Sequence, residues 1–158
     1  MIEFNHVTKT YARTHTHALR DVHFKVGRGE FVYVTGHSGA GKSTLLGLML
    51  RRILPSEGTV IIGGNDITRM RDSRLPHLRR QIGMVFQDHR LLPNLTAFEN
   101  LTFVLRATAT RGNHEQKALA ALRSVGLAHK RKAYPIELSL GEQQRVAIAR
   151  AMVTDPPL

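Results

Sequence analysis

The residues with the clearest chemical potential form one run near the start of the chain: Gly36, His37, Ser38, Gly39, Ala40, Gly41, Lys42, Ser43 and Thr44. This run fits the spacing G-x-x-x-x-G-K-[ST] of a phosphate-binding loop, or P-loop. Its glycines allow backbone N–H groups to converge on phosphate oxygens, and a helix that starts near Lys42 adds its positive dipole end. Lys42 is expected to reach the β- and γ-phosphates, and the Ser43 hydroxyl to bind Mg²⁺. The run therefore predicts a nucleoside triphosphate site.

A second predicted anion site lies far along the chain, where Ser139 and Gly141 stand at the start of a predicted helix. Free backbone N–H groups and the helix dipole attract anions at such a position. Two single residues complete the set. Tyr11, in a loop-prone stretch, is a candidate for stacking on an adenine ring, and a half-buried tyrosine at a strand end is the competing interpretation. Gln87 directly follows a predicted buried strand, which would bring its amide to the metal or to an attacking water.

The elements that must position these residues alternate in type along the chain. Apolar runs predict strands over residues 2–7, 19–26, 31–35, 59–62 and 82–86. Periodicity and capping signals predict helices from the P-loop to about residue 52, then over 72–80, 96–105, 115–125 and 142–152. This order predicts an α/β fold, in which a parallel-sheet core holds the P-loop and carries an antiparallel β part and a helical arm.

Composition limits the class of protein. A chain of 158 residues is long enough for one domain with a core. No apolar run approaches the roughly 20 residues that a membrane span requires, and the first residues lack the layout of a signal peptide. The absence of cysteine suits a reducing interior. We expect a soluble cytosolic domain.

The charge is unusual, with a net value of +11. Arginines gather over residues 69–80, and Lys130, Arg131 and Lys132 form a second group. Such a balance raises nucleic acid or an anionic membrane surface as a partner, whereas a solvated basic face explains the same residues. No RNA-binding signature or recognition-helix pattern accompanies them, so we expect no nucleic acid partner. None of the nine histidines has the spacing of a metal site.

Taken together, these residues resemble the ATP-binding cassette (ABC) family of P-loop NTPases. Tyr11, the run from Gly36 to Thr44, and Gln87 match the positions of its A-loop, Walker A and Q-loop. The stretch Leu138-Ser139-Leu140-Gly141-Glu142 is similar to its signature motif, and so is the Gln-Gln-Arg-Val-Ala-Ile-Ala-Arg-Ala that directly follows. The resemblance implies ATP and Mg²⁺ as cofactors, with Ser43 and Gln87 at the metal. It also implies a homodimer in which two ATP molecules lie between one protomer's P-loop and its partner's Ser139, Gly141 and Glu142.

A narrower resemblance is carried by the P-loop run and by residues 80–92, which are similar to the branch of the family that acts in bacterial cell division. It implies an integral membrane partner, a place on the cytoplasmic face of the inner membrane, and control of peptidoglycan hydrolysis at the septum. Three alternatives stay open: another ABC transporter ATPase, for a lipoprotein, amino acid or macrolide; a non-catalytic scaffold; and a basic nucleic-acid-binding module. The resemblance divides the chain into a β and P-loop part (1–87), a helical subdomain (88–138) and the signature segment (139–158).

Two departures from the family pattern lead to further expectations. The family's Walker B strand, catalytic glutamate and switch histidine follow the signature helix, and the sequence ends at Leu158, before them. We therefore expect an incomplete domain that does not turn over ATP by itself. Leu140 stands where the family has glycine. We expect its bulk to weaken the ATP sandwich, and a glycine there to permit backbone angles that a β-carbon resists.

Overall fold

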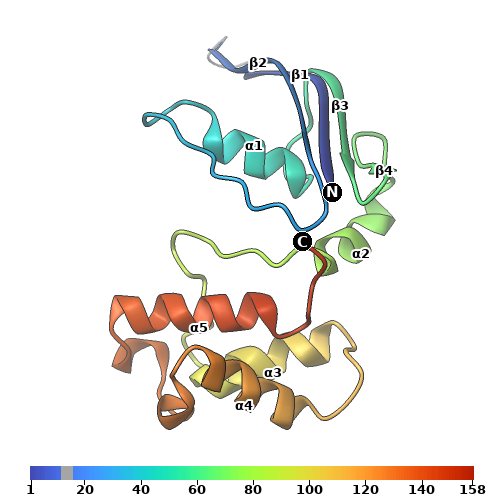
Figure 1. Ribbon diagram of the computed structural model, residues 1–158. Helices are drawn as coiled ribbons and strands as arrows, with labels where there is room; N and C mark the ends of the chain where they lie inside the picture. Colours follow the sequence, from blue (N-terminus) through green and yellow to red (C-terminus); the bar gives the residue numbers. More distant parts are fainter. Residues whose placement is uncertain (12–15) are drawn as a thin grey trace. The chain divides into compact units, whose positions relative to one another are not determined.

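A computed structural model describes residues 1–11 and 16–158 (Figure 1). The chain forms two compact units, residues 1–79 and 80–158, and each is described by itself. The predicted boundaries at residues 87 and 138 remain predictions. No helix in the described part of the chain combines the length and the apolar composition that crossing a bilayer requires.

The first unit contains a four-stranded antiparallel sheet with the strand order β2-β1-β3-β4. The strands are β1 (Ile2–Tyr11), β2 (Thr16–Val26), β3 (Glu57–Ile62) and β4 (Asn65–Asp66). Phe4 in the central strand β1 pairs with Phe24 of β2 on one side and with Val60 of β3 on the other. Residues directly opposite each other on neighbouring strands lie on the same face of the sheet. Phe4 and Val60 are both fully buried on that face. The antiparallel β part is thus as predicted, although β1 and β2 are longer than expected.

Two short helices accompany this sheet. Helix α1 (Lys42–Met49) starts at the P-loop and buries Thr44 and Leu48. It ends three residues earlier than the predicted limit at Arg52. A 3₁₀ turn (Asp72–Arg74) leads into α2 (Leu75–Arg80), as the arginine-rich segment predicted. Pro76 lies in the first turn of α2, where its missing N–H costs no hydrogen bond.

The second unit is a cluster of three longer helices, drawn from yellow to red in Figure 1: α3 (Ala97–Ala107), α4 (His114–Ser124) and α5 (Leu140–Met152). Short 3₁₀ turns at Ala128–Lys130 and Pro135–Glu137 connect α4 to α5. The three helices enclose an apolar core whose largest fully buried members are Leu101, Leu105, Leu122, Leu127 and Val146. Each helix starts with a side-chain cap, from Thr96, Asn113 and Ser139 respectively. The helical arm is therefore confirmed, and α5 starts two residues earlier than predicted.

Two of the predicted strands do not form. Residues 31–35 are not in a strand, and the side chains of Phe31 and Tyr33 are 81% and 80% exposed. A segment becomes a strand only when a neighbour supplies complementary backbone groups, and nothing in residues 1–11 and 16–158 pairs with this one. Residues 82–86 are likewise not a strand. Beside them, however, the Leu158 N–H donates to the Gln81 oxygen (3.2 Å) and the Gly83 N–H donates to the Leu158 oxygen (2.7 Å), which is the parallel pattern. Within residues 1–11 and 16–158, this pair of hydrogen bonds is the one trace of the predicted parallel core.

Candidate nucleotide-binding site

The P-loop is an exposed turn whose glycines adopt backbone angles that other residues avoid. Gly39 and Gly41 have φ values of +82° and +91°, in the left-handed region that favours glycine. A β-carbon on Gly41 would also collide with the backbone oxygen of Ala18. Both glycines are therefore required by the shape of the loop, as the sequence predicted.

Backbone N–H groups at the start of α1 have no acceptor within the described chain. No side chain caps α1, and Gly41, the residue before the helix, carries none that could do so. The N–H groups of Lys42, Ser43 and Thr44 lie in the first turn, where no helical carbonyl can accept from them. They are directed at the solvent-facing end of the loop, together with the positive end of the helix dipole. This arrangement fits a phosphate group, which would supply the missing acceptors.

The side chains of the loop are arranged for the same ligand. The Lys42 ammonium group donates to the backbone oxygens of Gly36 (2.7 Å) and His37 (2.8 Å), so it folds back over the loop. The ring of His37 contacts the backbone oxygen of Ser38 (2.8 Å). The Ser43 side chain is exposed, which leaves its hydroxyl accessible to a metal ion.

Tyr11 is connected to the P-loop helix directly. It is the last residue of β1, and its hydroxyl lies 3.3 Å from the Thr44 hydroxyl, which is otherwise buried in α1. The ring is 39% exposed, and the Lys9 ammonium group lies 5.4 Å from its centre. A partly exposed ring beside a phosphate loop is suitable for stacking on a base. Tyr11 precedes the P-loop by at least 25 residues in the sequence, and the fold brings the two together.

Gln87 lies in the second unit, in a loop whose conformation is held from α5. Its side chain is exposed. The next turn contains two consecutive residues in the left-handed region, His89 (φ +54°) and Arg90 (φ +49°). The Arg150 guanidinium donates to the backbone oxygens of both, at 2.7 Å and 2.5 Å, and burial lowers the pKa of Arg150.

No role for Arg150 follows from the sequence alone. Its position in the Ala-Arg-Ala run behind the signature was visible, but the two carbonyls that it binds lie about 60 residues earlier in the chain. Only the fold brings them together. The Gln87 loop and the signature helix are consequently one connected structure within this unit.

The start of α5 carries a complete capping box. The Ser139 hydroxyl accepts from the Glu142 N–H (3.3 Å), and the Glu142 carboxylate accepts from the Ser139 N–H (2.8 Å). The Lys130 ammonium group lies 3.1 Å from the other carboxylate oxygen. The backbone N–H of Ser139, then Lys130, then the Ser139 hydroxyl lower the pKa of Glu142 to about 2. Glu142 was predicted to contact nucleotide. In the structure its carboxylate binds the Ser139 N–H, which stabilises the first turn of α5.

Leu140 and Gly141 form the exposed first turn of this helix. The Leu140 side chain is 75% exposed, and its φ is not positive. Leu140 has ordinary helical angles, so the wider backbone freedom that a glycine would permit is not used at this position. The separate expectation that the bulk of Leu140 weakens the ATP sandwich stays a prediction. Gly141 has open space around it: a β-carbon there would find no atom nearer than the Arg145 guanidinium at 3.9 Å.

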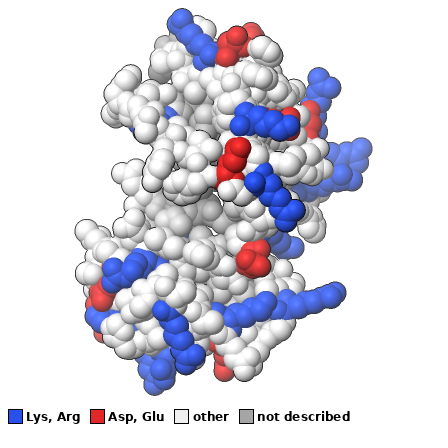
Figure 2. Space-filling model, viewed as in Figure 1, with Lys and Arg blue, Asp and Glu red and all other residues white. Residues whose placement is uncertain are grey.

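Two other features of the described residues are the arrangement of possible metal ligands and the distribution of charge. No group of three histidine, aspartate or glutamate side chains in residues 1–11 and 16–158 is arranged to hold a metal ion. Figure 2 shows lysine and arginine side chains in separate groups over the visible face, with acidic side chains between some of them.

Comparison with known proteins agrees with the geometry. The profile of the ABC transporter family matches residues 19–158. The cell division ATP-binding protein FtsE of Escherichia coli (strain K12) is 48% identical over 157 residues, which cover 99% of this chain and 70% of that protein. FtsE of Bacillus subtilis (strain 168) is 42% identical, with coverages of 99% and 68%. The dimeric post-hydrolysis structure of the ATP-binding cassette MJ0796 bound to ADP and Pi matches with a TM-score of 0.89 and 38% identity, over 99% of this chain and 71% of that one.

These likenesses extend over both units, so they include the P-loop, the Gln87 loop and the capped signature helix. They also confirm the mixed α/β cassette fold that the resemblance implied. The phosphate-fitting loop and the matches point to the same conclusion. The chain belongs to the ABC transporter family of ATP-binding cassette proteins.

Proposed function

We propose that this chain is the ATP-binding subunit of an ABC-type complex that acts in bacterial cell division. The observation that carries the proposal is the likeness to FtsE over nearly every residue, from β1 to the end of α5. A likeness confined to the P-loop would support nucleotide binding alone. Here the likeness covers 99% of the chain and so includes the helical unit as well.

The proposed cofactors are ATP and Mg²⁺. Lys42 and the free N–H groups at the start of α1 would hold the β- and γ-phosphates, and the exposed Ser43 hydroxyl would bind the metal ion with the Gln87 amide. Tyr11 would support the adenine ring. ATP supplies the phosphoanhydride bond whose cleavage drives the complex, and the residues of this chain bind and orient it.

The proposed assembly is a homodimer that encloses two nucleotides, with Ser139 and Gly141 of each protomer facing the P-loop of the other. The dimeric cassette MJ0796 bound to ADP and Pi supports the dimeric state in this proposal. We further propose an integral membrane partner of the FtsX type, which would hold the subunit at the cytoplasmic face of the inner membrane.

The test is a chromosomal Lys42→Ala substitution in the organism that encodes the protein. We expect dividing cells to become filamentous, because the ammonium group that neutralises the phosphates is lost, while the subunit still co-purifies with its membrane partner. Arg74→Ala, which removes an exposed arginine outside the site, serves as the control. Normal cell length together with a defect in solute transport would assign the chain to the alternative function, the ATPase of a transporter.

A further inference from the structure

The C-terminal end of the P-loop helix has an unusual residue at a position that normally favours glycine. The Arg51 N–H donates to the Leu48 oxygen and the Arg52 N–H donates to the Gly47 oxygen, both at 2.9 Å. This pair of bonds is the Schellman motif, whose residue after the cap adopts left-handed angles. Arg51 has a φ of +51°, a conformation that disfavours any residue with a β-carbon.

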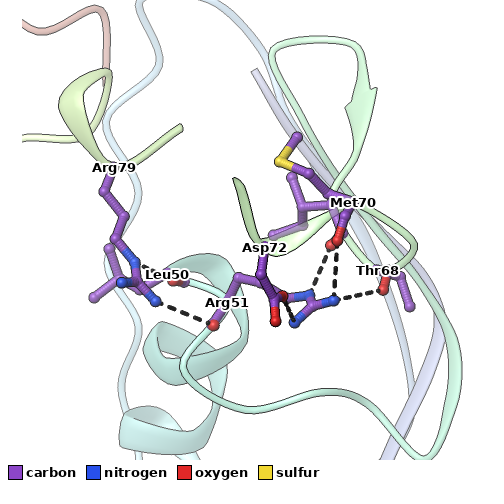
Figure 3. A network of polar contacts seen from close by, with 7 residues as sticks. Leu50, Arg51, Thr68, Met70, Asp72 and Arg79 are labelled. Atoms are coloured by element: carbon purple, nitrogen blue, oxygen red, sulfur yellow. Dashed lines mark hydrogen bonds and ion pairs between the residues drawn. The ribbon is translucent and has the colours of Figure 1, made fainter. Parts of the chain in front are cut away.

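The side chain of Arg51 offers a reason for tolerating that conformation. It is only 16% exposed. Its Nε donates to the Ile67 oxygen (3.0 Å), and its Nη2 donates to the oxygens of Thr68 (3.4 Å) and Met70 (3.2 Å). Figure 3 shows the guanidinium surrounded by these acceptors, with Asp72 beside it. Asp72 lies 3.6 Å away but is 87% exposed, so the carbonyl contacts dominate and the ion pair adds little.

A second arginine reaches the same helix end from α2. Arg79 donates from Nε to the Leu50 oxygen (3.2 Å) and from Nη2 to the Arg51 oxygen (3.4 Å). These two carbonyls belong to the C-cap residue of α1 and to the residue after it, just beyond Met49. The two arginines therefore hold the end of α1 from two directions, as the close view shows (Figure 3).

The segment that Arg51 grips is itself fixed to the sheet. The Ile67 N–H donates to the Val60 oxygen (2.9 Å), and the Thr68 hydroxyl accepts from the Val60 N–H (2.9 Å). Strand β3 is thus connected to the far end of α1 through Arg51, while β1 reaches its near end through Tyr11 and Thr44. Within the described chain, α1 buries only two side chains, so polar contacts at its ends determine much of its placement.

We propose that Arg51 is a positioning residue for nucleotide binding. By fixing the last turn of an eight-residue helix against residues 67–70, it sets the direction in which the N–H groups of the first turn face the phosphates. A helix of that length is about 12 Å long and moves as a rigid rod, so a tilt at Arg51 displaces the P-loop. This inference rests on the nucleotide-binding role of the P-loop and is independent of the role in cell division.

The test uses Arg51→Gly in the protein as its gene encodes it. Glycine suits the left-handed angles, so the variant removes the side-chain contacts without adding backbone strain. We expect the Kd for a fluorescent ADP analogue with Mg²⁺ to rise at least fivefold, and the amide hydrogens of residues 45–49 to exchange faster. Any ATPase activity should show a raised KM with kcat changed less than twofold.

Ala109→Gly is the matched control. Ala109 has a φ of +51° and ends α3 with the same pair of hydrogen bonds, Ala109 N–H to Arg106 and Thr110 N–H to Leu105, both at 3.0 Å. It has no side chain able to hold another segment, so its replacement should leave the Kd unchanged. Asp72→Asn should also leave it unchanged, because only the exposed ion pair is lost.

Arg51→Lys keeps the charge but lacks the planar fork that reaches three carbonyls, so we expect an intermediate Kd. An Arg51→Gly protein that folds and binds the analogue within twofold of wild type would overturn the proposal. Should Arg51→Gly fail to fold, a wild-type Kd and wild-type exchange of residues 45–49 in Arg51→Lys would overturn it equally.

Discussion

Among single residues, Glu142 shows how local contacts lower the pKa of a carboxyl group. Its carboxylate accepts a hydrogen bond from the Ser139 N–H and pairs with Lys130, and its pKa is lowered to about 2. A carboxylate whose pKa is lower in the folded state than in the unfolded chain stabilises the fold. That contribution is complete above the unfolded pKa near 4.3 and is lost as the pH falls towards about 2.

We therefore predict that Glu142→Gln makes the free energy of unfolding depend less on pH in the acidic range. Glutamine can still accept from the Ser139 N–H, but it has no charge to lose. Denaturant unfolding followed by circular dichroism between pH 6 and pH 2 should show a smaller loss of stability for the variant than for wild type. Glu115→Gln, in the first turn of α4 but outside any capping box, is the control. Parallel curves for wild type and Glu142→Gln would contradict the prediction.

Leu140 leads to a prediction about assembly. Its side chain extends from the exposed first turn of α5, which is the surface proposed to meet the partner's nucleotide. Accommodating extra methyl groups in a close interface typically costs 1–3 kcal/mol, so Leu140→Gly should strengthen ATP-dependent dimerisation by about tenfold. Leu140→Ala should lie between. Analytical ultracentrifugation with ATP measures the series, and equal dimer affinities for Leu, Ala and Gly would remove the argument from bulk.

The elements show which parts of the fold sequence reasoning predicts well. All of the predicted helices were found, because their caps and turns are local: Thr96 with Glu99, or Gly126 behind α4, act within a few residues. The strands at 31–35 and 82–86 were wrong for the structure described, since a strand depends on a neighbour that no local signal specifies. The same limit applies to the site. The P-loop could be predicted from nine residues, whereas Arg51, Arg79 and Arg150 act on segments distant in sequence.

At the level of elements, Arg150 connects the signature helix to the Gln87 loop, and its removal should loosen that loop. Arg150→Ala leaves the carbonyls of His89 and Arg90 without their donor, in a turn with two left-handed residues. We expect a loss of about 2 kcal/mol in the stability of the protein, the usual value for hydrogen bonds to a charged group. Amide exchange at residues 86–91 should also be faster.

Arg145→Ala provides the comparison for this prediction. Arg145 lies on the same helix, with its side chain exposed, and surface substitutions of this kind usually change stability by less than about 0.5 kcal/mol. Equal exchange rates at residues 86–91 in the two variants would show that Arg150 does not hold the loop.

For the whole molecule, the proposed dimer requires that each nucleotide site combine residues of two protomers. A symmetric pair of this kind makes a specific prediction for mixed dimers. Lys42→Ala disables a P-loop. Gly141→Glu places a carboxylate where the partner's phosphates are proposed to lie, and it does so without steric conflict, because a β-carbon at Gly141 meets nothing nearer than 3.9 Å. An acidic residue in the first helical turn also favours the helix, so this variant should fold.

If either variant paired with itself, both sites of the dimer would be damaged. We therefore expect that neither variant alone forms an ATP-dependent dimer. In a one-to-one mixture, a heterodimer has both defects in one site and none in the other. Because neither variant dimerises with itself, the dimers in the mixture are heterodimers with one intact site of two, so up to about half of the wild-type sites should return. Nucleotide retained on the dimer peak in gel filtration measures this recovery. A mixture that retains no more nucleotide than its components would show that the two elements do not meet across a dimer, and that each protomer binds ATP with its P-loop alone.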